Sequence, residues 1–159
     1  MKSEAPRLDK NAILIALSQS DRTAFGRDNF VTQSGSQKVF SSIWALEAEV
    51  NNGGFSQYFF NESRETAAFV VEALRSVGAR QTAEICRKAI DTAFPAGLPS
   101  DLAVIRSVAA DLSEESEGKL NELDRQFYLY PDNLTELLYA FVAAHPEEFG
   151  ELPHDGATQ

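Results

Sequence analysis

The sequence predicts an all-α fold, a compact single-domain bundle of about six or seven helices. Two observations predict it. Apolar residues recur at spacings of three and four along most of the chain, which is the period of an amphipathic helix, and Ser, Asp or Asn often stands ahead of these runs, as helix N-caps do. We find no run that alternates apolar and polar residues as a half-buried strand does. With 159 residues, 43% of them hydrophobic, the chain is long enough for one domain with its own core.

The first helix is predicted to follow Asp9, a plausible N-cap, with Ile13, Leu14 and Leu17 on one face. The periodic pattern then stops. We therefore expect residues 1–35 to form an N-terminal helix and an ordered arm or loop.

A second helix is predicted to begin near Ser36. Its apolar positions, at spacings of three and four, are Val39, Phe40, Ile43, Trp44, Leu46 and Val50. Two asparagines and two glycines, residues 51–54, then supply the backbone freedom that ends helices. A short helical turn is expected over residues 55–61.

Three further helices are expected between residues 61 and 112. Asn61 is expected to cap the first of them, and Gly78 is expected to end it. The second covers residues 80–94. The third begins at Ser100 or Asp101. Their apolar positions are Ala68, Val71 and Leu74, then Ala83, Cys86, Ala89, Ile90 and Phe94, then Leu102, Ile105, Ala109 and Leu112.

The last helix is predicted to follow Asn133, whose spacing from Glu136 is that of a capping box, and to end at Pro146. We expect residues 36–149 to form the helical domain and residues 150–159 to form a disordered tail.

The net charge of −10 belongs to the last third of the chain. Residues 1–100 hold 11 acidic and 11 basic residues, whereas residues 101–159 hold 13 acidic and 3 basic residues. Such a field repels nucleic acid and anionic lipid and attracts a basic surface. Direct binding to DNA or RNA is therefore disfavoured. A solvated acidic face that only keeps the protein in solution stays open as an alternative.

A helix over residues 111–127 would place its leucines and Phe127 on one side and its acidic residues on the other, although Gly118 weakens the expectation of unbroken helix. We predict that a partner contacts carboxylates of the acidic third. The candidates are Asp111, Glu114, Glu115, Glu117, Glu122, Asp124, Asp132, Glu136, Glu147 and Glu148.

No cofactor, metal or catalytic group is predicted. His145 and His154 have no Cys or His at ligand spacing, and Cys86 lies on an apolar face, where a buried, inert thiol is expected. Gly53 and Gly54 follow a helix, whereas a phosphate-binding loop follows a strand.

Glu47 and Glu49 lie two residues apart on the second helix, so they point in different directions. Glu47 falls within the apolar arc, and we expect it to bond to amides or side chains of the turn at residues 55–58 as a structural clamp. A catalytic role for a pocket near Glu47, Asn51, Gln57 and Tyr58 stays open, because a core-facing carboxyl can have a raised pKa.

The run Trp44 to Asn61 fits the pattern E-x-E-V-x-N-G-G-F-x-Q-[YF]-[FL]-x-N. It resembles the signature of a bacterial family typified by a DNA-mimic protein, and the likeness extends from about residue 37 to residue 145. The matched residues, which we interpret as mainly structural, are Trp44, Glu47, Glu49, Asn51, Gly53, Gly54, Phe55, Gln57 and Asn61.

The resemblance implies an acidic all-helical protein, a homodimer, whose carboxylates imitate DNA phosphates. Its implied partner is a basic DNA-binding protein such as a helix-turn-helix transcription factor. A scaffold or immunity-type protein that binds a partner through Tyr128, Tyr130 and nearby acids, without imitating DNA, is the other interaction hypothesis.

Localisation is expected to be cytoplasmic. The N-terminal residues have no apolar signal core, and no stretch approaches the roughly 20 apolar residues of a membrane helix.

Overall fold

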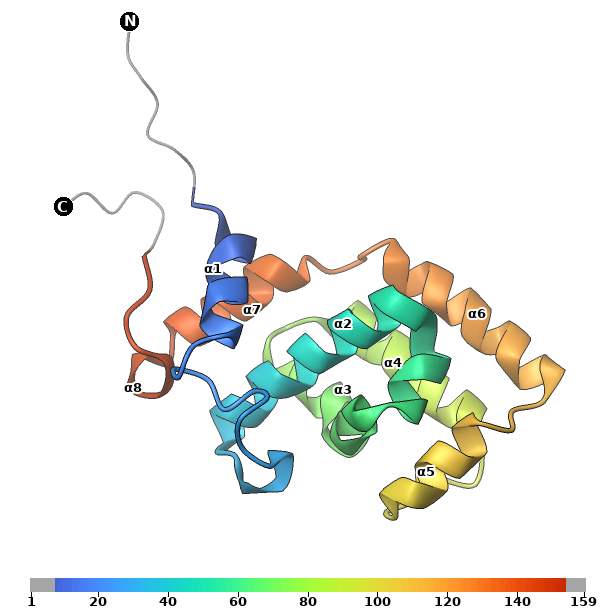
Figure 1. The fold of residues 1–159 in the computed structure, drawn as a ribbon. Coiled ribbons are helices and arrows are strands. Elements are labelled where there is room, and N and C mark those ends of the chain that lie inside the picture. The colour runs from blue at the N-terminus through green and yellow to red at the C-terminus, as the bar shows by residue number, and fades with distance from the viewer. Residues whose placement is uncertain (1–7, 154–159) are drawn as a thin grey trace, which may run out of the picture.

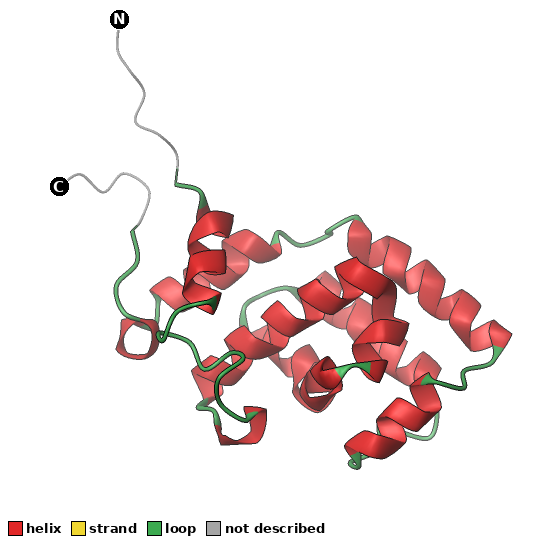
Figure 2. Ribbon diagram, in the orientation of Figure 1, coloured by secondary structure: helices red, strands yellow, loops and turns green. Residues whose placement is uncertain are grey.

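The computed structural model describes residues 8–153, and these residues form eight α-helices and two short 3₁₀ helices with no strand. The all-α prediction is confirmed, and Figure 2 shows helices joined by short loops. The α-helices are α1 (Lys10–Ser18), α2 (Gly35–Phe60), α3 (Ala67–Ser76), α4 (Arg80–Ala93), α5 (Leu102–Ala109), α6 (Glu114–Tyr128), α7 (Leu134–Ala143) and α8 (Pro146–Phe149), and the 3₁₀ helices are η1 (Phe30–Thr32) and η2 (Glu62–Thr66).

Helix α2 runs through the middle of the molecule and contacts α3, α5, α6, α7 and η2 (Figure 1). Helices α4, α5 and α6 lie around its C-terminal part, whereas α1, α7 and α8 gather near its other end. The core along α2 is aromatic: Phe55, Tyr58 and Phe59 are buried, and Phe59 meets Phe94 edge to face at 5.1 Å between ring centroids.

Several helix ends are those that the sequence predicts. The side chain of Asp9 accepts a hydrogen bond from the amide of Ala12, and Asp101 caps α5 in the same way. Asn133 accepts from the amide of Glu136 at the start of α7. These caps satisfy backbone donors that have no partner within the helix.

The predicted interruption of the second helix at the glycine pair is confirmed, as is the helical turn after it. Gly54 has φ +78°, as a helix-ending glycine does, and helix resumes at Phe55 and continues to Phe60. We call Gly53 and Gly54 the α2 kink. A side chain at position 54 would also collide with a neighbour, since an added Cβ would lie 2.8 Å from Cγ of Asp124.

Two expectations differ from the structure. Asn61 gives no side-chain cap to η2, because its amide binds Glu49 instead. Pro146 is the first residue of α8, a position that suits its fixed φ and missing N–H, so the chain re-enters helix there.

The C-terminal residues as far as Pro153 are described. Arg22 donates through Nε to the carbonyl of Phe149 at 2.5 Å and through Nη2 to that of Glu151 at 2.7 Å. The rest of the predicted tail, residues 154–159, and residues 1–7 of the predicted N-terminal arm lie outside the described residues. No helix in the described part of the chain is both long and apolar enough to cross a membrane.

Candidate functional site

The acidic residues at the start of α6 form an exposed surface. Ser113 caps this helix by accepting from the amide of Ser116 at 3.1 Å, and the helix runs unbroken through Gly118. Acidic side chains in a first turn are favoured by the positive end of the helix dipole. We define the α6 acidic surface as the exposed carboxylates Asp111, Glu114, Glu115, Glu117 and Glu122.

Two of these five carboxylates are partly neutralised by cations on α6 itself. Glu115 pairs with Lys119 at 3.3 Å, and Glu122 pairs with Arg125 at 2.6 Å. Asp111, Glu114 and Glu117 have no ion pair within residues 8–153. The uncompensated charge therefore concentrates at the beginning of α6 and in the turn before it.

The structure separates most of the other candidate carboxylates from this surface. Asp132 accepts from the amide and hydroxyl of Thr82 at the start of α4, at 2.7 and 3.0 Å. Glu136 pairs with a lysine of α1, and Glu148 accepts a hydrogen bond from Ser34. Glu147 and Glu148 lie on α8, at the end of the molecule away from α6 (Figure 1). The ten candidates do not form one continuous face.

The placement of Asp124 on the exposed acidic side is wrong. Its side chain is buried, with 9% relative exposure, and it accepts a hydrogen bond from the amide of Phe55 at 2.8 Å. The helical wheel puts Asp124 at the edge of the apolar arc, and the segment after the α2 kink packs against that edge. Burial raises the pKa of this carboxyl, an effect that the Phe55 amide and Arg125 oppose.

The clamp predicted for Glu47 is made by Glu49. Oε2 of Glu49 accepts from Nε2 of Gln57 at 2.7 Å and from Nδ2 of Asn61 at 2.9 Å. The assignment to Glu47 fails because the kink brings the segment after Gly54 back along the side of α2 that carries Glu49. Glu49 thus joins Gln57 and Asn61 to the part of α2 before the kink.

Glu47 instead faces the connection between α6 and α7. Its Oε2 accepts from the hydroxyl of Tyr130 at 2.8 Å, and the same hydroxyl accepts from Nδ2 of Asn51 at 2.7 Å. Burial raises the pKa of Glu47, and the Tyr130 hydrogen bond opposes this rise. Burial, opposed by the Asn51 amide, also raises the pKa of Tyr130 to about 12.

The four residues of the enzyme hypothesis do not meet in one pocket. Glu47 and Asn51 line a cavity between α1 and α2, whereas Gln57 is engaged by Glu49. Tyr58 is in the core, where its hydroxyl lies 2.5 Å from that of Thr66. Burial raises the pKa of the Tyr58 hydroxyl well above its ordinary value. This arrangement offers no acid and base pair at a common site.

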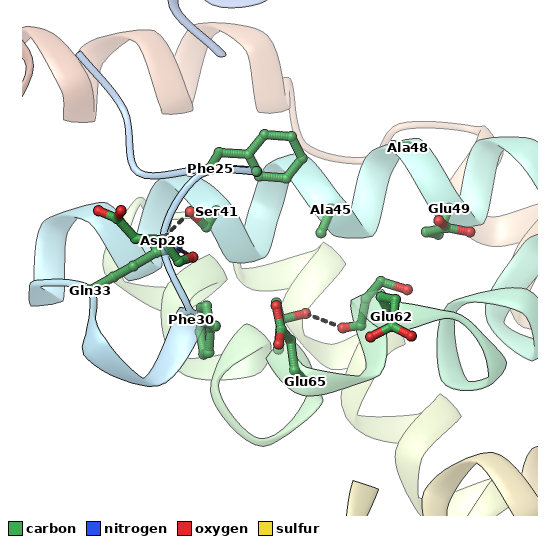
Figure 3. Close-up of a pocket in the computed structure, with 13 residues that line it drawn as sticks. Phe25, Asp28, Phe30, Gln33, Ser41, Ala45, Ala48, Glu49, Glu62 and Glu65 are labelled. Carbon is green, nitrogen blue, oxygen red and sulfur yellow. Dashed lines mark hydrogen bonds between the residues drawn. The ribbon is translucent and has the colours of Figure 1, made fainter. Parts of the chain in front are cut away.

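A second group of carboxylates, which sequence reasoning missed, lines a pocket of about 250 Å³ between the loop after α1, helix α2 and η2 (Figure 3). Phe25, Phe30 and the small residues of α2 form its apolar walls; its acidic side chains are Asp28, Glu49, Glu62 and Glu65. These acids belong to the half of the chain whose charges cancel, so a count along the sequence gives no signal for them. Burial and then the nearby Glu62 raise the pKa of Glu65.

Metal and thiol chemistry have no support in the described residues. No group of three His, Cys, Asp or Glu side chains between residues 8 and 153 has an arrangement that could hold a metal ion. Cys86 is buried, as predicted, and burial raises the pKa of its thiol. His145 lies 2.7 Å through Nδ1 from the carbonyl of Phe141, and His154 is outside the described residues.

Exposed apolar side chains lie at the end of α6 and just after it. Tyr128, Leu129 and Tyr130 are 45%, 81% and 38% exposed. The hydroxyl of Tyr128 donates to the carbonyl of Val50 at 2.9 Å, so part of this segment is tied to α2.

Comparison with known proteins gives one family. The family model described as "DMP19-like protein" matches residues 32–145, well over half of the chain, and this range includes the run from Trp44 to Asn61. No curated protein matches the chain. No solved structure matches it either.

Proposed function

The chain belongs to the DMP19-like protein family, a family of DNA-mimic type, and we propose that it is a non-enzymatic protein that binds a basic DNA-binding protein in place of DNA. The α6 acidic surface is the proposed contact. The partner proposed is a helix-turn-helix transcription factor or another protein with a basic nucleic-acid-binding surface.

The observation that carries the proposal is the exposed, uncompensated charge at the start of α6. Glu114 to Glu122 spans about 12 Å of helix axis at about 1.5 Å per residue. Duplex DNA carries about seven charges over that length, at about one per 1.7 Å. The α6 acidic surface presents five carboxylates in and just before this span. Two of the five are paired with cations of α6, so the surface carries about three uncompensated negative charges, a little under half of the charge of the duplex over the same length.

The mechanism is competition for the same cations. Lysine and arginine side chains that contact phosphates on DNA would pair with carboxylates of α6. Most of these carboxylates stay in water, so we expect association to be fast and to weaken as salt rises.

The test is capture from a lysate of the source organism at low salt, with and without excess duplex DNA. Each captured protein is then assayed for DNA binding by gel shift. The proposal expects a protein that binds DNA, is captured without competitor and is lost with it. The proposal would be contradicted if the captured proteins do not bind DNA, or if they bind this protein and DNA at the same time.

A charge-matched pair of variants locates the contact. The variant Asp111→Asn, Glu114→Gln, Glu117→Gln removes the uncompensated charges of the α6 acidic surface. The control variant Asp21→Asn, Glu72→Gln, Glu151→Gln removes the same number of exposed carboxylates elsewhere. We expect at least a tenfold loss of affinity for the captured protein in the first variant and less than threefold in the second. Equal losses would point to net charge alone.

The exposed side chains of Tyr128, Leu129 and Tyr130 favour a second candidate, a scaffold protein that binds a partner without imitating DNA. Competition with duplex DNA distinguishes the two functions. DNA should displace a partner that binds this protein through its DNA-binding surface, and it should not displace a partner that binds through another surface.

A further inference from the structure

A cavity of about 240 Å³ lies between α1 and α2, away from the α6 acidic surface. Its lining combines an apolar wall with one carboxylate. Leu14 and Ile15 of α1 line one side of it, and Trp44, Glu47 and Asn51 of α2 line the other. Since a protein cavity of about 150 Å³ admits a molecule the size of benzene, this one has room for a small organic ligand.

The apolar wall is formed by α1 and α2 together. Leu14 is buried, Ile15 is 42% exposed at the mouth, and Trp44 stacks on Phe40 with 5.4 Å between ring centroids and 12° between ring planes. The indole is therefore held in place by core packing. A short hydrocarbon chain in the cavity would contact this wall and leave water.

Glu47 is the charged residue of the lining, and no lysine or arginine is among the residues that line the cavity. Its Oε2 is used by the Tyr130 hydroxyl at 2.8 Å. Its other oxygen, Oε1, has no hydrogen bond within the described residues. No cation among residues 8–153 forms an ion pair with Glu47 and burial raises its pKa, so a positive charge placed here would offset the cost of burying the carboxylate.

The Tyr130 contact holds the carboxylate in a fixed orientation. Tyr130 is the non-glycine residue with positive φ, 49°, among residues 8–153, and its hydroxyl also accepts from Asn51. A bulky residue adopts this backbone conformation only where its surroundings impose it. The Tyr130 hydroxyl occupies Oε2 of Glu47 and is itself held by the Asn51 amide, so one carboxylate oxygen is left for a ligand.

We propose that this cavity binds a primary ammonium group on a short apolar stem, with Glu47 as its counter-ion and Trp44 against the stem. A primary ammonium is a compact point charge that one carboxylate oxygen can meet. A guanidinium is a poorer match, because its preferred fork needs both oxygens of the carboxylate. The ammonium belongs to a free small amine or to a lysine side chain of another protein.

The protein carries its own reporter for this site, because Trp44 is its one tryptophan. Trp44 fluorescence is titrated at pH 7.5 with n-pentylamine, and with 1-pentanol and pentanoate as neutral and anionic controls of the same length. We expect a saturable change with pentylamine and at least tenfold weaker responses with both controls. A response to pentanol as strong as that to pentylamine, or no saturation with pentylamine, would overturn the proposal.

The variant Glu47→Gln keeps an acceptor for the Tyr130 hydroxyl and removes the charge. We expect it to bind pentylamine at least tenfold more weakly, while Glu72→Gln, an exposed control on α3, binds as the parent does. Unchanged affinity in Glu47→Gln would overturn the role of Glu47.

The parent protein supplies a check that needs no variant. Lowering the pH toward 4 protonates Glu47, so we expect pentylamine affinity to fall while the weak pentanol response stays constant. The other titratable side chains near the cavity are Tyr130, which stays protonated in this range, and the Lys10–Glu136 pair between α1 and α7. A pentylamine affinity that does not change with pH would contradict the proposal.

A capped lysine, Nα-acetyl-lysine methylamide, distinguishes the two sources of the ammonium. Binding of both pentylamine and the capped lysine assigns the cavity to a lysine side chain of a partner, whereas binding of pentylamine alone assigns it to a free amine. This proposal does not rest on DNA mimicry, since no residue of the α6 acidic surface lines the cavity.

Discussion

Carboxylates occur in two settings in this protein, and the contrast separates structural residues from those proposed to bind a partner. Around the α2 kink, Asp124 and Glu49 accept hydrogen bonds from a backbone amide and from two side-chain amides. At the start of α6, Asp111, Glu114 and Glu117 are exposed and have no ion pair among the described residues. The first group joins segments of the chain, and the second leaves its charge available to another molecule.

The difference shows why the residues that resemble the family signature do not by themselves reveal the function. Several of them, Glu49, Gly54 and Phe55 among them, lie at the α2 kink or join the segments on its two sides. The proposed contact lies on another helix, in a stretch whose only requirement is exposed negative charge. Substitutions at the kink should therefore lower stability, whereas substitutions on α6 should weaken binding.

The largest effect is expected at the kink itself. Gly54→Ala places a Cβ at φ +78°, 2.8 Å from Cγ of Asp124, so backbone strain and a steric clash add. We expect a loss of about 4 kcal/mol in the free energy of unfolding, measured by urea denaturation. Gly118→Ala is the control: an added Cβ there meets nothing within 4 Å, and alanine favours helix. A loss below about 1 kcal/mol at position 54 would contradict the strain argument.

A smaller loss of stability is expected from substitution of Asp124, which accepts a hydrogen bond from Phe55 next to the kink. Asp124→Ala leaves the buried amide of Phe55 without its acceptor, which costs about 2 kcal/mol. Exposed Glu122→Ala on the same helix should cost less than about 0.5 kcal/mol. Equal losses in the two variants would show that Asp124 acts only through general charge or helix propensity.

Removal of the hydrogen bonds made by Glu49 is expected to lower the free energy of unfolding by less than Asp124→Ala does. Glu49→Ala deprives the amides of Gln57 and Asn61 of a shared acceptor, but these groups are half-buried and can turn partly to water. We expect a loss of about 1 to 2 kcal/mol in thermal or urea unfolding. A variant as stable as the parent would remove Glu49 from the set of structural residues.

The raised pKa of Glu47 predicts the direction in which folding stability changes with pH. Burial raises its pKa in the folded state above the unfolded value, so the contribution of this group favours folding at low pH and is lost as pH rises through the folded pKa. Relative to the parent, Glu47→Gln should therefore have a higher Tm at pH 7, and this gap should narrow as pH falls toward 4. A gap that widens at low pH would reverse the assigned sign.

The smallest effect on stability is expected on α6. The variant Asp111→Asn, Glu114→Gln, Glu117→Gln should unfold within about 1 kcal/mol of the parent, since its exposed groups make no ion pair and lose only a part of their helix-dipole attraction. Circular dichroism during thermal unfolding measures this directly. A large loss would mean that these residues are structural, as those at the kink are.

Much of the helix order could be predicted because caps and apolar spacing are local signals. Asp9, Asp101 and Asn133 cap helices as their positions indicate. The path at the kink could not be predicted, since the backbone freedom of Gly54 is visible in the sequence but its direction depends on Asp124, 69 residues from Phe55. For the same reason the clamp was assigned to Glu47, whereas Glu49 makes it.

The candidate site could be predicted only in part. The charge count locates the acidic third and the start of α6, because exposure of a charged helical face is a local property. Caps made across the fold, such as Asp132 at the start of α4, could not be told from free carboxylates. The acidic pocket beside η2 gives no signal along the chain, since its charges come together only in space.

The most direct test of carboxylates acting in place of DNA is a displacement titration. A fluorescently labelled duplex is bound to the DNA-binding protein captured by this chain, and the parent, the α6 variant and its charge-matched control are added in turn. We expect the parent and the control to release the duplex to completion and the α6 variant to require at least tenfold more protein. Formation of a ternary complex, or equal release by the α6 variant, would contradict the proposed role of the α6 acidic surface.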